Sequence, residues 1–303
     1  MTGERKNTTR PSKELDPHQV PAINFSVDRL YLNDDPIGKG NLIWSKEQDG
    51  ITINSLTLVG KNIDLSGQGY WHMTPRGQGT ALNLQIQTPS LGDLQHELGL
   101  TTGIEQAPTQ VKAELYWPTS PLEMGADKLY GSLWLKVGKG QVNNVDPGMG
   151  RLIGLFSLNA LGKRLALDFS DLFSKGMAFD SIEGNFNLND GEAYTTDLAL
   201  RSTLASVDIR GRTGLSSRTY DQRVVVIPNV SATLPLVGAL AINPSVGVAL
   251  AVTQQLFGKQ FDRIAMRTYE VTGSWDNPQF RQLEEARDPN RKNVHMPELP
   301  GSE

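Results

Sequence analysis

Apolar and polar residues alternate over most of the chain, and this period of two constrains the fold more than any other feature. Successive side chains of a β-strand point to opposite faces, so the pattern predicts antiparallel strands with one apolar and one polar face. Gly, Asn, Asp or Pro ends each run, and KEQDGI, LVGKN and LNDGEA are typical hairpin turns. The clearest runs are Ile23/Phe25/Val27, Ile51/Ile53, Leu56/Leu58, Ile63/Leu65, Leu82/Leu84/Ile86, Leu133/Leu135/Val137, Phe186/Leu188, Leu198/Leu200, Val207/Ile209 and Tyr269/Val271.

One pair of strands recurs as a weak internal repeat. The segment LTLVGKNIDLSGQGYW, Leu56 to Trp71, resembles LALRSTLASVDIRGRTGL, Leu198 to Leu215. Each segment has two alternating apolar residues, a polar turn, two more alternating apolar residues and then a glycine, and each precedes a strand that ends at Pro. Such repetition predicts an extended sheet built by adding similar units rather than a closed enzyme fold.

Charge and composition exclude several classes of function. The 303 residues carry a formal net charge of -4, whereas a nucleic-acid binder needs clustered Lys and Arg to neutralise phosphates. There is no Cys, and the four His are scattered without ligand spacing, so we expect no disulfide, metal or cofactor. Residues 1–20 are polar, lack the apolar core of a signal peptide, and are expected to form a disordered leader or linker.

A segment at about residues 148–176 breaks the strand pattern and has helical spacing. We expect two short helices here, the second one capped by Gly176. Their apolar faces would be formed by Leu152, Leu155, Phe156, Leu172 and Phe173.

The same segment contains two patterns that suggest enzyme chemistry. GMGRLIG resembles a nucleotide-binding turn, but its third glycine comes one residue too late for G-x-G-x-x-G. Asp168 and Asp171 would share a helix face as an acid–base pair, although acids are also favoured in the first turn of any helix. Since there is no G-x-S-x-G motif and no His in a distinctive context, we expect no catalytic residues and no enzyme.

The stretch from Val224 to Gly258 contains no charged residue and no His. A membrane-spanning helix, a buried core segment and a lipid-contacting segment are all compatible with this composition. Pro228, Pro235 and Pro244 interrupt it, and the Pro-free remainder would be about 21 Å long as a helix, short of the ~30 Å hydrocarbon core. We therefore favour a strand at Val224–Ile227 followed by short apolar segments, the last of which would present Val246, Ala249, Leu250 and Phe257 on one helical face.

Several long segments of the sequence resemble those of a known family. GMGRLIGLFSLNALGKRLALDFSDLFSKG, then ASVDIRGRTGL and YEVTGSWDNPQF, resemble the C-terminal region of YhdP-type proteins, which are AsmA-like proteins of the Gram-negative envelope. The similarity is strong over about residues 125–284 and looser from about residue 20.

The resemblance implies a fold, a location and a function. Family members are anchored in the inner membrane by an N-terminal helix, cross the periplasm, and carry phospholipid between the inner and outer membranes along an elongated, curved antiparallel sheet that forms an apolar groove. We therefore expect a mainly β region over residues 21–280, with a helical insert at about 148–176, an apolar segment at about 234–258, and a polar tail over 281–303. We also expect the chain to be part of a longer protein.

Two hypotheses follow from these expectations. In the first, the chain is a non-catalytic lipid-transfer module that contacts phospholipid acyl chains and the inner leaflet of the outer membrane. In the second, it is a structural or regulatory envelope scaffold that binds a protein partner and carries no lipid. The candidate lipid- or membrane-contacting residues are Leu152, Leu155, Phe156, Leu172, Phe173, Leu200, Ile209, Leu234, Leu236, Val246, Ala249, Leu250 and Phe257.

Overall fold

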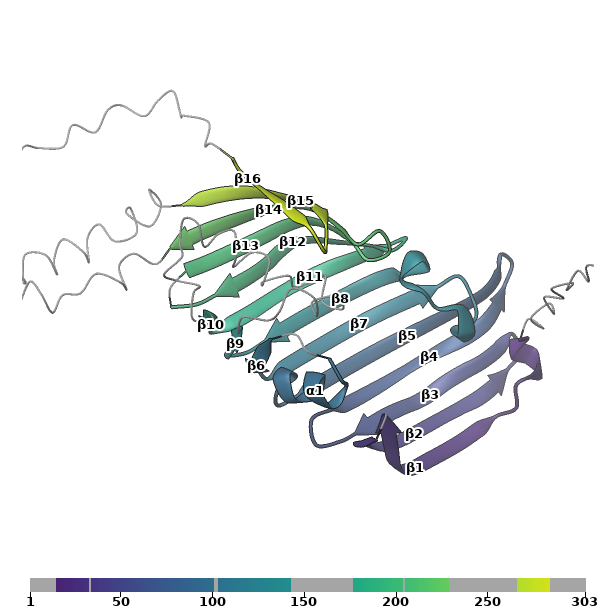
Figure 1. Ribbon diagram of the computed structural model, residues 1–303. Helices are drawn as coiled ribbons and strands as arrows, with labels where there is room; N and C mark the ends of the chain where they lie inside the picture. Colours follow the sequence, from purple (N-terminus) through teal and green to yellow (C-terminus); the bar gives the residue numbers. More distant parts are fainter. Residues whose placement is uncertain are drawn as a thin grey trace, which may run out of the picture.

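One long antiparallel sheet dominates the computed structural model, which describes residues 15–32, 34–100, 103–142, 177–203, 205–228 and 266–283. Its thirteen strands follow the order of the chain, and the sheet stays open, with β1 at one edge and β16 at the other (Figure 1). The strands are β1 (Ile23–Leu32), β2 (Asp35–Glu47), β3 (Gly50–Val59), β4 (Asp64–Thr74), β5 (Gly77–Thr88), β7 (Thr109–Trp117), β8 (Tyr130–Val137), β11 (Ser181–Asn189), β12 (Glu192–Arg201), β13 (Ala205–Gly214), β14 (Thr219–Pro228), β15 (Arg267–Ser274) and β16 (Pro278–Leu283). The sequence prediction of an extended, mainly β antiparallel sheet is confirmed.

The connections from β5 to β7 and from β8 to β11 hold a helix and a second, three-stranded sheet, and Figure 1 shows both at the same ends of the central strands. Ala107, Val142 and Phe179, from this region, are buried in one hydrophobic cluster with the main sheet. The elements are α1 (Leu91–Glu97), β6 (Ile104–Gln106), β9 (Gly140–Val142) and β10 (Met177–Phe179), and short 3-10 helices lie at Pro17–Gln19, Pro121–Glu123 and Ala126–Lys128.

The turn sequences act as the residues predict. Asp190 and Gly191 join β11 to β12 with φ angles of +51° and +75°, the left-handed pair that a two-residue type I′ hairpin requires. At the LVGKN turn, the Gly60 N–H donates to the Ile63 carbonyl oxygen at 2.7 Å and closes the connection between β3 and β4.

The internal repeat corresponds to two equivalent hairpins, β3–β4 and β12–β13, and each contains a β-bulge at the same place. The register shifts between Ile53 and Leu56 on β3, and between Thr195 and Leu198 on β12. Each bulge moves the alternation by one residue, so that the following leucines return to the apolar face. Gly211 lies opposite the second bulge at φ +132°, where a Cβ would stand 2.3 Å from the Asp221 carbonyl oxygen.

The helix α1 was not predicted from the sequence. The Ser90 hydroxyl caps it by accepting from the Asp93 N–H at 3.2 Å, and Gly99 adopts φ +70° just after its end. The capping Ser and the terminal Gly can both be recognised in SLGDLQHELG, but the segment is too short to show a helical spacing of apolar residues. The helices expected at about 148–176 and 234–258 lie outside the described residues.

Candidate functional site

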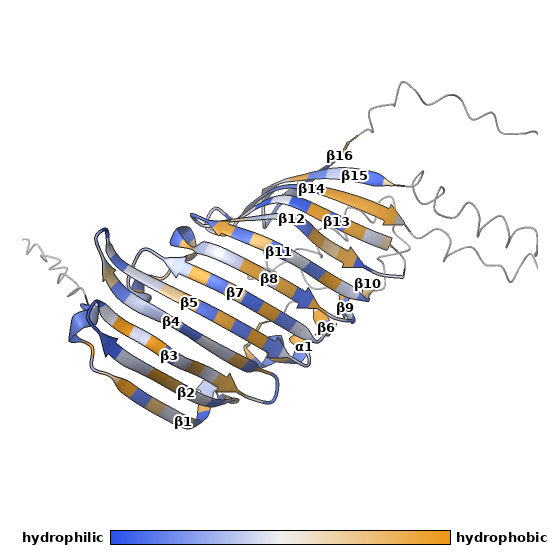
Figure 2. Ribbon diagram, turned by 180° about the vertical axis from the view of Figure 1, so that it is seen from behind, coloured by the Kyte–Doolittle hydropathy of each residue, from blue (hydrophilic) through white to orange (hydrophobic). Residues whose placement is uncertain are grey.

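The register of the strands places most of their large apolar side chains on one side of the sheet. For example, Leu58 pairs with Leu65, and the row continues through Ile86, Val111 and Leu135. Figure 2 shows the resulting alternation of hydrophobic and hydrophilic bands along the strands. We call this side the apolar face; its members are Ile23, Phe25, Val27, Leu42, Trp44, Ile51, Ile53, Leu56, Leu58, Leu65, Trp71, Leu82, Leu84, Ile86, Val111, Ala113, Leu115, Leu133, Leu135, Val137, Ile182, Phe186, Leu188, Leu198, Leu200, Val207, Ile209, Val224, Val226, Tyr269 and Val271.

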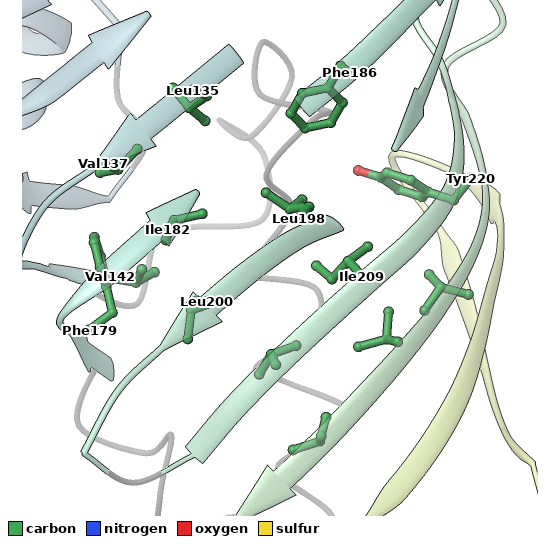
Figure 3. Packing of buried hydrophobic residues seen from close by; sticks show 14 of the residues in the cluster. Leu135, Val137, Val142, Phe179, Ile182, Phe186, Leu198, Leu200, Ile209 and Tyr220 are labelled. Carbon is green, nitrogen blue, oxygen red and sulfur yellow. The ribbon is translucent and has the colours of Figure 1, made fainter. Parts of the chain in front are cut away.

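Exposure of the apolar face changes along the sheet. From β11 to β15 its side chains are buried, with Leu200 at 1% and Val224 at 0% exposure, and Figure 3 shows this cluster packed on one side of the strands. From β1 to β7 most of them remain partly accessible, Leu82 and Leu84 among them, and Phe25 is 56% exposed. The face is therefore a packed core at one end and an accessible apolar surface at the other.

The opposite side of the sheet, the polar face, carries amides, hydroxyls and charges. Ion pairs join neighbouring strands across it, with Nη1 of Arg212 2.5 Å from Glu192 and Nη2 of Arg201 2.6 Å from Asp208. Such partly exposed ion pairs add little to stability, but their charges keep this side of the sheet hydrated. One apolar and one polar face is the arrangement of an antiparallel sheet that shields an apolar ligand or core on one side only.

Asp197 has a defined electrostatic environment on the polar face. Desolvation alone would raise the pKa of its carboxyl group, but hydrogen bonds outweigh this effect and hold the pKa below its usual value. The Asn185 side chain donates to Oδ2 of Asp197 at 2.7 Å, and the Asn185 backbone N–H donates to Oδ1 at 2.9 Å. These contacts tie β11 to the bulge of β12.

Two of the thirteen predicted contact residues fall within the described part of the chain. Leu200 and Ile209 lie on adjacent strands of the apolar face, where Leu200 pairs with Val207 and Ile209 pairs with Leu198. The structure brings them together in the packed end of the face, and their contact with lipid stays a prediction. The remaining ones lie outside the described residues: Leu152, Leu155, Phe156, Leu172, Phe173, Leu234, Leu236, Val246, Ala249, Leu250 and Phe257.

The accessible part of the apolar face was missed as a candidate site. Ile53, Leu56, Leu82 and Leu84 belong to alternating runs that the sequence makes plain, yet alternation alone does not say which strands are left uncovered. Among the described residues, no group of three or more His, Asp or Glu could hold a metal ion, and no helix is both long and apolar enough to cross a membrane.

Fold and site together define an open-sheet β protein with one continuous apolar face. A model of the YhdP protein family matches residues 1–280, and the chain belongs to that family. The intermembrane phospholipid transporter YhdP of Escherichia coli (strain K12) is 29% identical over 239 residues, which cover 77% of this chain. The chain spans 19% of the length of that transporter. No solved structure matches the chain.

Proposed function

We propose that the chain is a non-catalytic phospholipid-binding and transfer module of an envelope-spanning protein that moves lipid between the inner and outer membranes. The observation that supports this proposal best is the apolar face, which continues from strand to strand from β1 to β15. The relative is by name an intermembrane phospholipid transporter, which agrees with this reading. The module would work in the periplasm.

The dimensions of the sheet suit acyl chains. Thirteen strands spaced by about 4.8 Å give a face roughly 58 Å long, and the 11 residues of β4 give it a width of roughly 36 Å. Each methylene of an acyl chain gains about 0.8 kcal/mol when apolar side chains replace water around it. The head group would stay in water at the margin of the sheet, so that binding depends on the acyl chains and not on head-group chemistry.

Transfer also requires a surface without a polar barrier. In the row formed by Leu56, Gly67, Leu84, Ala113 and Leu133, no polar side chain separates one strand from the next. An acyl chain could therefore move from strand to strand without any charge or amide being desolvated. No bond is made or broken, and lipid follows a gradient of supply or affinity.

A matched pair of substitutions on β5 tests the proposal. Leu84→Asp places a carboxylate on the accessible part of the apolar face, whereas Asn83→Asp places the same charge on the polar face one residue away. Transfer of an acyl-labelled fluorescent phosphatidylethanolamine between donor and acceptor vesicles should slow by about tenfold or more for Leu84→Asp, since a charge against acyl chains is costly to desolvate. Asn83→Asp should transfer at the wild-type rate.

The same assay separates the proposal from a scaffold role. Circular dichroism must first show that both variants are folded. If the wild-type chain neither binds nor transfers lipid, or if Leu84→Asp transfers normally, the apolar face is not a lipid path. A structural or regulatory protein that binds a partner would then be the better account.

A further inference from the structure

The polar face contains a hollow of about 570 Å³ that the proposed function leaves unused. Residues 66–68, 83–85, 112–114, 132–134 and 185–186, from β4, β5, β7, β8 and β11, line it. In each of the first four groups the middle residue is in register with the apolar face, as Leu84, Ala113 and Leu133 are, so it contributes only backbone to the floor. The outer residues of each group point to the polar face and form the walls.

The walls are two straight rows of side chains. Strand register aligns Ser66, Gln85, Lys112, Trp134 and Asn185 in the first row. The hollow therefore crosses five strands at right angles, and with a strand spacing of about 4.8 Å it is roughly 19 Å long. We call it the polar trough.

The second row has the same character. It consists of Gln68, Asn83, Glu114 and Ser132, again aligned by register. Amides and hydroxyls both donate and accept hydrogen bonds, as sugar hydroxyls do. Because each wall carries a single charge, Lys112 in one and Glu114 in the other, the trough is close to neutral overall.

Aromatic rings stand in and beside the trough. Trp134 is half-buried in the first wall, with Nζ of Lys112 5.4 Å from its ring centroid. Tyr116 and Tyr130, two residues further along their strands from the second wall, have ring centroids 6.5 Å apart. Such rings provide flat apolar surfaces that can pack against the C–H faces of a sugar ring.

We propose that the polar trough binds a linear, uncharged oligosaccharide that lies across the strands, with its hydroxyls hydrogen-bonded to the amides of both walls. An acyl chain would leave these polar walls unsatisfied. A single Lys is too little to hold a nucleic-acid backbone. A peptide strand cannot add to the trough floor, because the backbone groups of these interior strands already pair with their neighbours. A protein interface is built around a cluster of desolvated apolar side chains, whereas Trp134 is the one large apolar side chain in the two walls.

Calorimetric titration of the folded chain with chitohexaose tests this inference. The oligosaccharide should bind, and Trp134→Ala should weaken binding by about tenfold. Asn83→Ala and Gln85→Ala, which change one wall each, should also weaken it, while Asp221→Ala, on the polar face of β14 and outside the trough, should not. If Trp134→Ala does not fold, the affinities of Asn83→Ala and Gln85→Ala still test the inference.

Several results would overturn the inference. One is the absence of heat with chitohexaose and maltohexaose at millimolar concentration. A second is binding that all three trough variants leave unchanged. A third is binding of hexaglycine or phospholipid vesicles in the trough, detected as a loss on Trp134→Ala, without binding of either oligosaccharide. None of these results bears on lipid transfer by the opposite face.

Discussion

Truncating one leucine at each end of the apolar face should have very different effects on stability. Leu200 is 1% exposed, and Leu200→Ala removes a buried isobutyl group, at roughly 0.8 kcal/mol per lost methylene plus the free energy of the cavity left behind. The expected loss is about 2–5 kcal/mol in the free energy of unfolding. Leu84 is only partly covered, so Leu84→Ala loses only part of the free energy of transferring the side chain out of water and leaves no enclosed cavity. The expected loss is about 1 kcal/mol.

Urea unfolding followed by circular dichroism measures both losses. An extended sheet can lose its ends before its centre, so coincident transitions by tryptophan fluorescence are needed before a single free energy is assigned. Arg223→Ala, at an exposed position on β14, serves as the matched control and should stay within about 0.5 kcal/mol of wild type. Lipid-free protein must be used, because bound acyl chains would stabilise the native state.

Equal losses at the two positions would refute the reasoning, as would a larger loss at Leu84 than at Leu200. The first result would mean that the apolar face is packed to the same degree along its whole length. The second would place the packed end of the face at β1–β7, and the proposed lipid path would then have no accessible surface.

Three further predictions concern local structure. Gly211→Ala should cost about 2 kcal/mol or more in urea unfolding, because its Cβ would meet the Asp221 carbonyl; Gly77→Ala, at φ +112° in open space, should cost less. A double-mutant cycle on Arg212 and Glu192, each 27% exposed, should give a coupling free energy of about 1 kcal/mol or less. Asp197 stabilises the fold above about pH 4, so the stability difference between wild type and Asp197→Asn should shrink as pH falls below that value.

The period of two made the main sheet predictable, because side-chain direction in a strand follows directly from sequence position. It succeeded where large apolar residues alternate without interruption, as on β5 and β8. It missed β2, whose Pro36, Gly38 and Gly40 break the pattern, and β7, where Ala113 weakens it. Both strands hold their place through pairing with neighbours, which local periodicity does not record.

The candidate sites were harder to predict for a physical reason. The sequence indicated that Leu84 and Leu200 each lie on the apolar side of their strand. Their different exposure, however, depends on which strands pack together in three dimensions. The polar trough depends on register across five strands, which sets Gln85 beside Lys112 and Lys112 beside Trp134. A shift of one residue in any strand pairing would move these side chains out of alignment. The sequence of a single strand does not specify its register with its neighbours.

Photo-crosslinking along β5 is the most direct test of the central claim that lipid lies on one face of the sheet. A benzophenone amino acid is placed in turn at each position from Leu82 to Gln87, and the protein is irradiated with radiolabelled phospholipid. Crosslinks should alternate, with label at Leu82, Leu84 and Ile86 and none at Asn83, Gln85 and Gln87. Equal labelling at neighbouring positions, or labelling confined to the polar face, would contradict the account.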